Sequence, residues 1–395
     1  MQILSLFAGS KRLKRIVLSL YVGMMVILVV STFMAAAVGE RMVSEHIYDA
    51  WWFMAWWGAL GVSLLLVVVQ WLRNRARHAA SCRGIGRCAV IHLHVAFLLI
   101  LLGAALTALT ARRGVVYLQP RLEVNRFLDA AHHRILPLPF TLQLDSLEVT
   151  CDPGTMQHAD YVSHLHVDTV AVTVSMNRVT TVQGYRLTPY SYDEAAQVSW
   201  LSVNYDPWGI GVTYLGYLWF ACSFLIWLRR YVAYALLALV AGVALQLYAE
   251  STPLQPVLRS AWLGIHVSFI VMAYTLFAFL GVNGVMGMCM SSRREALMRQ
   301  SLRLLRPAEG LLGVGIFMGA VWANQSWGRY WAWDSKEVWA LITFMLYALP
   351  FHYRRFSWLQ QPSRFHLFML LAFLSVLITY FGCNYFMSGL HSYVG

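Results

Sequence analysis

Long apolar runs recur along the whole chain, each close to the roughly 20 residues that a membrane-spanning helix needs. Short polar or basic stretches separate these runs. They lie near residues 16–37, 52–72, 89–110, 209–228, 231–248, 263–287, 309–323, 337–352 and 367–387. The pattern predicts a polytopic α-helical membrane protein with about nine transmembrane helices.

One long segment, residues 111–206, has a different periodicity. Apolar and polar residues alternate in "TLQLDSLEVT" (141–150), "HLHVDTVAVTVSM" (164–176) and "VSWLSVNY" (198–205), as in strands with one buried face. The "MNRV" at 176–179 suits a hairpin turn. We therefore predict a small β domain inserted between the third and fourth helices. The expected units are helices one to three at 1–110, the β domain at 111–206, the fourth helix at 207–230 and the last five helices at 231–395.

Charged residues make up only 12% of the chain, against about a quarter in soluble proteins. The net charge of +12 could indicate a nucleic-acid partner. However, most Lys and Arg residues gather at 11–15, 73–87, 229–230, 293–306 and 354–364. With nine spans and a cytoplasmic N-terminus, all of these clusters face the cytoplasm, as the positive-inside rule requires. We expect membrane lipid and no nucleic acid as a partner, with the β domain and the C-terminus extracytoplasmic.

Four histidines in or beside the spans form two levels. His94 lies about five residues into the third span and His352 at the cytoplasmic end of the eighth, whereas His266 and His391 lie at the outer ends of the sixth and ninth. Neutral histidine is a common haem-iron ligand, and ionisable groups within spans are costly. Two pairs at two depths predict two ligand sets for one planar cofactor. A lone helix histidine is more often a packing residue, and His92, about 200° round the helix from His94, leaves open which of the two faces a site.

The stretch "WANQSWGRYWAWDSKEVWALITF" (322–344) combines five tryptophans with a few charges. An interfacial aromatic belt explains two or three of these rings, but not their close spacing. Gly328 allows a tight turn, and Asp334 suits the N-terminus of the next helix. We expect the loop 322–336 to form a flat aromatic shelf for a porphyrin between the outer histidines, with ring faces from Trp327, Trp331 and Trp333.

These residues resemble a known family. "WGRYWAWDSKEVWALITF" is similar to the WWD signature of haem-handling proteins and, more closely, to the CcsA component of System II cytochrome c biogenesis. "LRSAWLGIHVSFIVMAY" and "YFGCNYFMSGLHSY" match the same family pattern. "HLHVAFLLILLGAALTA" and "WLSVNYDPWGIGVTYLGY" resemble its ResB-like partner, CcsB. The whole chain therefore resembles a fused CcsBA cytochrome c synthase, CcsB-like over 1–230 and CcsA-like over 231–395.

The resemblance implies a haem lyase of the holocytochrome-c synthase type in the bacterial cytoplasmic (inner) membrane. It would export haem b and join it through thioether bonds to the CxxCH motif of apocytochrome c on the outer side. It implies His94 and His352 as transmembrane iron ligands and His266 and His391 as external ligands that also act in catalysis. The remaining haem-binding residues implied by the motif are Trp327, Gly328, Tyr330, Trp331, Trp333 and Asp334.

The six cysteines form no CxxC motif, so the resemblance also implies a separate thioredoxin-like reductant for the substrate thiols. Two features depart from the family pattern: the outer domain is much shorter than in large fused members, and Ser335 stands where proline is common. A haem-delivery protein of another maturation system, which passes haem to a chaperone, is the alternative function. A secondary transporter for an organic anion would lack haem and would need broken helices at the midplane.

Overall fold

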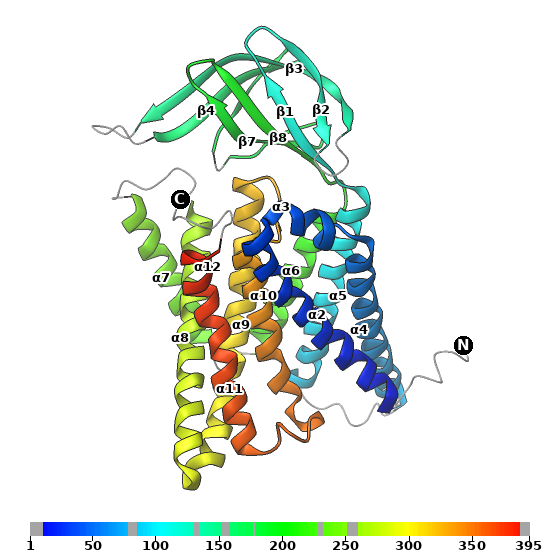
Figure 1. The fold of residues 1–395 in the computed structure, drawn as a ribbon, viewed down its shortest axis with the longest axis vertical. Coiled ribbons are helices and arrows are strands. Elements are labelled where there is room, and N and C mark those ends of the chain that lie inside the picture. Colours follow the sequence, from blue (N-terminus) through cyan, green and yellow to red (C-terminus); the bar gives the residue numbers. More distant parts are fainter. Residues whose placement is uncertain are drawn as a thin grey trace.

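The protein consists of a helical bundle with a β domain seated on one end (Figure 1). The computed structural model describes residues 11–77, 85–129, 134–151, 158–176, 178–227, 232–250 and 260–387. The chain leaves the bundle after α5 (Ile85–Thr110), forms the β domain, and returns through α6 (Gly209–Trp227). These two helices pack along each other, because Gly103, Gly209 and Gly216 leave no room for a side chain between their backbones.

The helices before the β domain are α2 (Lys11–Val38), α4 (Trp51–Arg77) and α5, with α3 (Glu40–Val43) and the π-helix η1 (Ser44–Tyr48) joining α2 to α4. The helices after α6 are α7 (Val232–Glu250), α8 (Ala261–Cys289), η4 (Ser291–Arg293), α9 (Arg294–Ser326), α10 (Ser335–Ala348), η5 (Leu349–Arg355), α11 (Pro362–Leu377), η6 (Ile378–Gly382) and α12 (Cys383–Tyr385). The α9–α10 connection lies at the end of the bundle that carries the β domain (Figure 1).

Seven helical segments in the described ranges are long and apolar enough to cross a membrane, which supports a polytopic membrane protein. The expected count of nine spans is not reached by this measure. The apolar part of α7 covers only Ala233–Ala244, and α10 is 14 residues long. Pro350 follows α10 and stands in the first turn of the 3₁₀ helix that continues the chain, where proline's missing N–H is tolerated.

The basic segment 288–306, which the charge pattern predicts as a short loop, is mostly helical. Helix α9 runs 33 residues from Arg294 and passes through Pro307 without interruption. Leu297, Ser301 and Leu305 recur every four residues and are buried against the bundle. The loop prediction was wrong because the segment is an amphipathic helix. Its arginines lie on the outer face, and its buried residues recur at helical spacing on the inner face.

The β domain is one antiparallel sheet in the order β5-β4-β3-β2-β1-β8-β7-β6. Its strands are β1 (Arg112–Leu118), β2 (Glu123–Asp129), β3 (Ile135–Cys151), β4 (His158–Val167), β5 (Val170–Val174), β6 (Thr180–Val182), β7 (Tyr185–Asp193) and β8 (Val198–Tyr205). The run predicted as one strand at 164–176 turns at Asp168, whose φ is 54°. The turn expected at 176–179 follows β5, where Ser175 bridges to Arg178.

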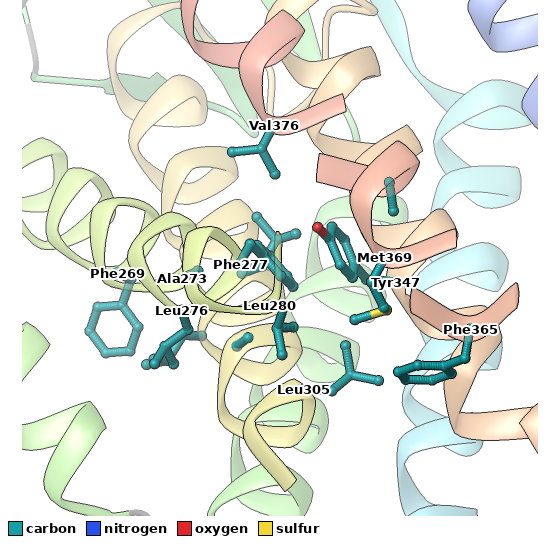
Figure 2. Packing of buried hydrophobic residues seen from close by; sticks show 14 of the residues in the cluster. Phe269, Ala273, Leu276, Phe277, Leu280, Leu305, Tyr347, Phe365, Met369 and Val376 are labelled. Atoms are coloured by element: carbon teal, nitrogen blue, oxygen red, sulfur yellow. The ribbon is translucent and has the colours of Figure 1, made fainter. Parts of the chain in front are cut away.

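The largest apolar core of the bundle lies among α8, α9, α10 and α11 (Figure 2). At its centre the rings of Phe277 and Tyr347 stack with centroids 4.0 Å apart. Ala273 and Ala308 are fully buried in the same cluster, and such small residues let membrane helices approach closely. This core holds α8, which carries His266, in a fixed relation to α10, which leads into η5 and His352.

Candidate functional site

Two imidazoles from distant parts of the chain meet on the side of the bundle away from the β domain. His94 lies on α5 and His352 lies in η5, and their ring centroids are 6.3 Å apart with planes at 85°. Imidazole nitrogens bind a metal at about 2 Å. The separation therefore has room for one metal ion between the two rings. The structure brings together the pair that the depth of the histidines predicts.

The hydrogen bond of His352 determines which of its nitrogens can bind a metal. Its Nδ1 lies 3.3 Å from the carbonyl oxygen of Ala348. A carbonyl only accepts, so Nδ1 carries the proton and the lone pair is on Nε2. Metal-binding histidines commonly have their second nitrogen engaged in this way.

The neighbouring histidine, His92, points elsewhere. Its side chain is exposed, and its ring lies 5.8 Å from that of Trp219. Only His94 faces His352, so the geometry favours His94 in the choice that the sequence left open.

His266 lies near the start of α8, at the β-domain end of the bundle. Its Nδ1 donates to the carbonyl oxygen of Gly315 on α9 at 2.7 Å, which again leaves the lone pair on Nε2. Its predicted partner His391 lies outside the described residues, so the outer pair is represented by His266 alone.

Gly319 makes room for the His266 ring. A Cβ at this position would lie 2.6 Å from Cε1 and 2.7 Å from Nδ1 of the ring. Because His266 is predicted to bind haem iron, we expect Gly319→Ala to displace the imidazole and to lower haem affinity by about tenfold, the smaller effect typical of lost ligand support. Haem titration of the purified variant measures this. Gly211→Ala is the matched control, because nothing lies within 4 Å of its added Cβ, and equal affinity in both variants would contradict the expectation.

The loop between α9 and α10 ends in a capping box. Asp334 is the N-cap of α10, and the Glu337 carboxylate returns to the Asp334 N–H, which confirms the predicted cap. Glu337 Oε2 also accepts from the Ala332 N–H at 2.7 Å. Because one carboxylate binds two backbone groups, the last residues of the loop are held against the first turn of the helix.

The tryptophans of this loop do not form one flat shelf. Trp327 packs edge-on against Trp322 with centroids 4.8 Å apart, and Trp331 meets Trp333 at 85°. Trp333 has one face covered by the stacked ring of Tyr48, 4.9 Å away. The expected shelf was wrong in geometry, because each ring follows its own packing partners. Trp331 and Trp333 form a compact aromatic cluster with rings that precede or begin α4.

The β domain holds the other end of the loop. Gly328 has the predicted turn conformation, with φ 72°, and its carbonyl accepts from the Asn204 side chain. Tyr330 donates to Thr107 Oγ1 at 3.0 Å, and Thr107 donates to Asp206 at 2.6 Å. The loop is therefore bonded to α5 and to the last strand of the sheet.

Arg186 on β7 also binds this region of the chain. Its guanidinium donates to the side-chain oxygen of Asn324 and, at 2.9 Å, to its main-chain oxygen. Burial lowers the pKa of Arg186, but arginine remains charged. We expect Arg186→Ala to reduce stability by about 1–3 kcal/mol and to expose the β domain to protease. Arg112→Ala, at an exposed position of the same domain, is the control. Equal proteolysis rates for both variants would show that the hydrogen bonds between Arg186 and Asn324 are dispensable.

Sequence reasoning assigned no role to Tyr48, Arg186 or Glu337. Only Glu337 had a local signal, because an acidic N-cap followed three residues later by Glu is a capping-box pattern. Among the other histidines, His366 on α11 is fully buried, and its Nε2 lies 2.9 Å from the carbonyl oxygen of Arg294. In the described ranges, no group of three or more His, Cys, Asp and Glu residues could hold a metal ion.

Two consecutive segments of the chain match known protein families. Residues 79–207 match the ResB-like family, and residues 208–391 match the cytochrome C assembly protein family. His94 therefore lies in the first segment, whereas His266, His352 and the tryptophan loop lie in the second.

The curated relatives each match about a third of the chain or less. Protein NrfI of Wolinella succinogenes is 41% identical over 36% of this chain and 17% of its own length. The cytochrome c biogenesis protein CcsA of Porphyra purpurea is 32% identical over 36% of this chain and 60% of its own. CcsA of Gloeobacter violaceus is 45% identical over 26% of this chain and 30% of its own. The chain thus spans less than two thirds of each of these relatives.

Proposed function

Because this chain belongs to the fused CcsBA-type cytochrome c biogenesis proteins, with ResB-like and cytochrome c assembly segments in one polypeptide, we propose that it is a cytochrome c synthase. It takes haem b from the inner leaflet or the cytoplasm, carries it across the bacterial inner membrane, and attaches it to the CxxCH motif of apocytochrome c outside. The described members of the basic clusters lie at the end of the bundle away from the β domain, which supports a cytoplasmic N-terminus and an outer β domain.

The observation that carries the proposal is the meeting of His94 and His352 with ring centroids 6.3 Å apart. One comes from the ResB-like segment and the other from the assembly segment. Haem iron takes imidazole ligands from both faces of the porphyrin plane. In this proposal the inner site therefore forms only where the two segments pack together, because each segment supplies one of its two ligands.

The outer site is the second stage. His266 presents Nε2 near the β-domain end of the bundle and, with His391, would take the iron over from the inner pair. Hydrogen bonds from the β domain hold the loop 322–336 at the same end of the bundle. Haem at this level is accessible to an apocytochrome on the outer side.

The attachment step needs positioning more than a catalytic nucleophile. Each substrate thiol adds across a haem vinyl group: sulfur bonds to one carbon of the double bond, and the thiol proton goes to the other. No electrons are gained or lost overall. The protein holds haem so that a bimolecular addition becomes local, and the histidine of CxxCH would replace one of the outer imidazoles. A separate thioredoxin-like protein would keep the substrate thiols reduced.

Expression with an apocytochrome c in a host that lacks cytochrome c maturation systems tests the proposal. We expect covalent haem on the apocytochrome and bis-histidine haem in the purified protein, and we expect His266→Ala to abolish the product. A protein that holds haem but yields product only with a haem chaperone would instead be a delivery protein. Purification without haem, and no binding on haem titration, would refute both.

A further inference from the structure

The loop with the WWD motif has a partner that belongs to neither matched segment. Tyr48 lies in the link between α2 and α4, before the ResB-like match begins at residue 79. Its ring stacks on Trp333 with centroids 4.9 Å apart and planes 12° apart. Phe53 and Trp57, from the start of α4, pack on the same indole at 5.1 and 6.4 Å. The link between α2 and α4, together with the start of α4, therefore forms one wall of the aromatic cluster.

Tyr48 is itself anchored. Only 5% of its surface is exposed, and its hydroxyl lies 2.7 Å from the hydroxyl of Ser31 on α2. Ser31 uses its single proton to bond the carbonyl of Leu28 at 2.8 Å, so Tyr48 is the donor in the pair. Tyrosine keeps its proton at physiological pH in any case, and burial raises the pKa of Tyr48 further, to about 12. The ring has one position and one orientation.

Trp333 needs such support. Its φ is 59°, in the left-handed region that a bulky residue rarely adopts. Conformations of this kind persist only where the surroundings determine them, and they gather at functional sites. The capping box holds the backbone on the C-terminal side of Trp333, while Tyr48 holds its ring.

We propose that Tyr48 is a positioning residue of the outer haem site, which orients the Trp333 indole against the porphyrin. The inference rests on the proposed function and deepens it. If the Tyr48 ring served only as packing, its loss would weaken haem binding equally at the inner and the outer level. A ring that orients Trp333 affects the outer level alone, because His94 and His352 lie at the other end of the bundle.

Separating the two haem levels gives the test. The His94→Ala, His352→Ala double variant keeps only the outer site, and His266→Ala keeps only the inner pair. Each purified protein is titrated with haemin and followed by its absorption spectrum. In the outer-site background, Tyr48→Ala is expected to weaken haem binding by about twofold to tenfold, the effect of one lost aromatic stack. In the inner-site background its affinity stays unchanged.

Conservative variants and a control make the result specific. Tyr48→Phe keeps the stacked ring and restores most of the outer affinity, and Ser31→Ala, which removes only the anchor, gives a smaller loss in the same direction. Trp51→Ala alters a neighbouring aromatic that is 81% exposed and leaves both sites unchanged. Inner-site haem binding shows that each variant is folded.

An unchanged outer affinity in Tyr48→Ala overturns the inference, as does an equal loss at both levels, which marks Tyr48 as a packing residue only. If Tyr48→Ala does not fold, an unchanged outer affinity in Ser31→Ala together with a large loss in Tyr48→Phe also overturns it. If the unmodified protein binds no haem, the proposed function itself is wrong. Titration of the unmodified protein therefore separates this outcome from a failure of the inference about Tyr48.

Discussion

Replacement of either inner histidine, His94→Ala or His352→Ala, is expected to reduce holocytochrome c formation by at least about tenfold and to remove the haem bound at the inner level. Loss of a group that merely supports a metal ligand typically costs about 10–100-fold in affinity, so loss of a ligand costs at least as much. Haem-stained cytochrome c and the spectrum of the purified variant measure the effect. The two variants should fail to the same extent, because in the proposed mechanism the two histidines bind opposite faces of one iron.

Two comparisons give this prediction its specificity. His92→Ala is the control, since its ring faces Trp219 rather than His352, and it should leave yield and spectrum unchanged. Added imidazole should partly rescue His94→Gly, because a free ligand can enter the space that the smaller residue leaves. A His92 variant with the stronger defect would transfer the role to His92, and normal yield from the His352 variant would remove the inner site from the mechanism.

The meeting of His94 and His352 could be anticipated from the sequence, because depth in a membrane follows from charge clusters and helix rise. Asp334 could be predicted as a cap for a similar reason, since capping depends on residues within one turn. Both inferences use local or one-dimensional information. The ligand roles of these histidines stay predictions, as does that of His391.

Features that depend on packing between distant segments could not be predicted in this way. Tyr48 and Trp333 are separated by most of the chain, and nothing near either residue indicates the stack. The flat shelf failed for the same reason: ring orientation is set by neighbours from other helices, not by spacing in the loop. The amphipathic start of α9 was hidden because its arginines dominate the composition of the segment while its buried leucines are few.

The buried carboxyl group of Glu309 takes no part in the proposed mechanism. Glu309 on α9 is 5% exposed, and neither carboxyl oxygen has a hydrogen-bond partner among the described residues. The hydroxyl of Tyr347 on α10 is also buried and has no hydrogen-bond partner among the described residues. Two buried polar groups without partners are costly for stability, and proteins retain such cost chiefly at functional positions.

Glu309→Met is therefore expected to raise the stability of the protein. A buried polar group left unbonded costs about 1–3 kcal/mol, and methionine fills a similar volume without that cost. The midpoint of thermal unfolding in detergent should rise by about 1 °C for each kcal/mol recovered in a chain of 395 residues. Glu295→Met is the matched control on the same helix, because Glu295 has a side chain that is 77% exposed and a weak pairing with Arg299 at 3.5 Å. Its midpoint should not move.

The yield of holocytochrome c in the same variant decides what the carboxyl is for. A more stable protein with lower yield would assign Glu309 to the movement or attachment of haem, as expected when stability is given up for function. Greater stability with normal yield would make the group a tolerated defect of packing. A lower midpoint would contradict the burial argument itself, because it would require that the carboxyl be well bonded in the folded protein.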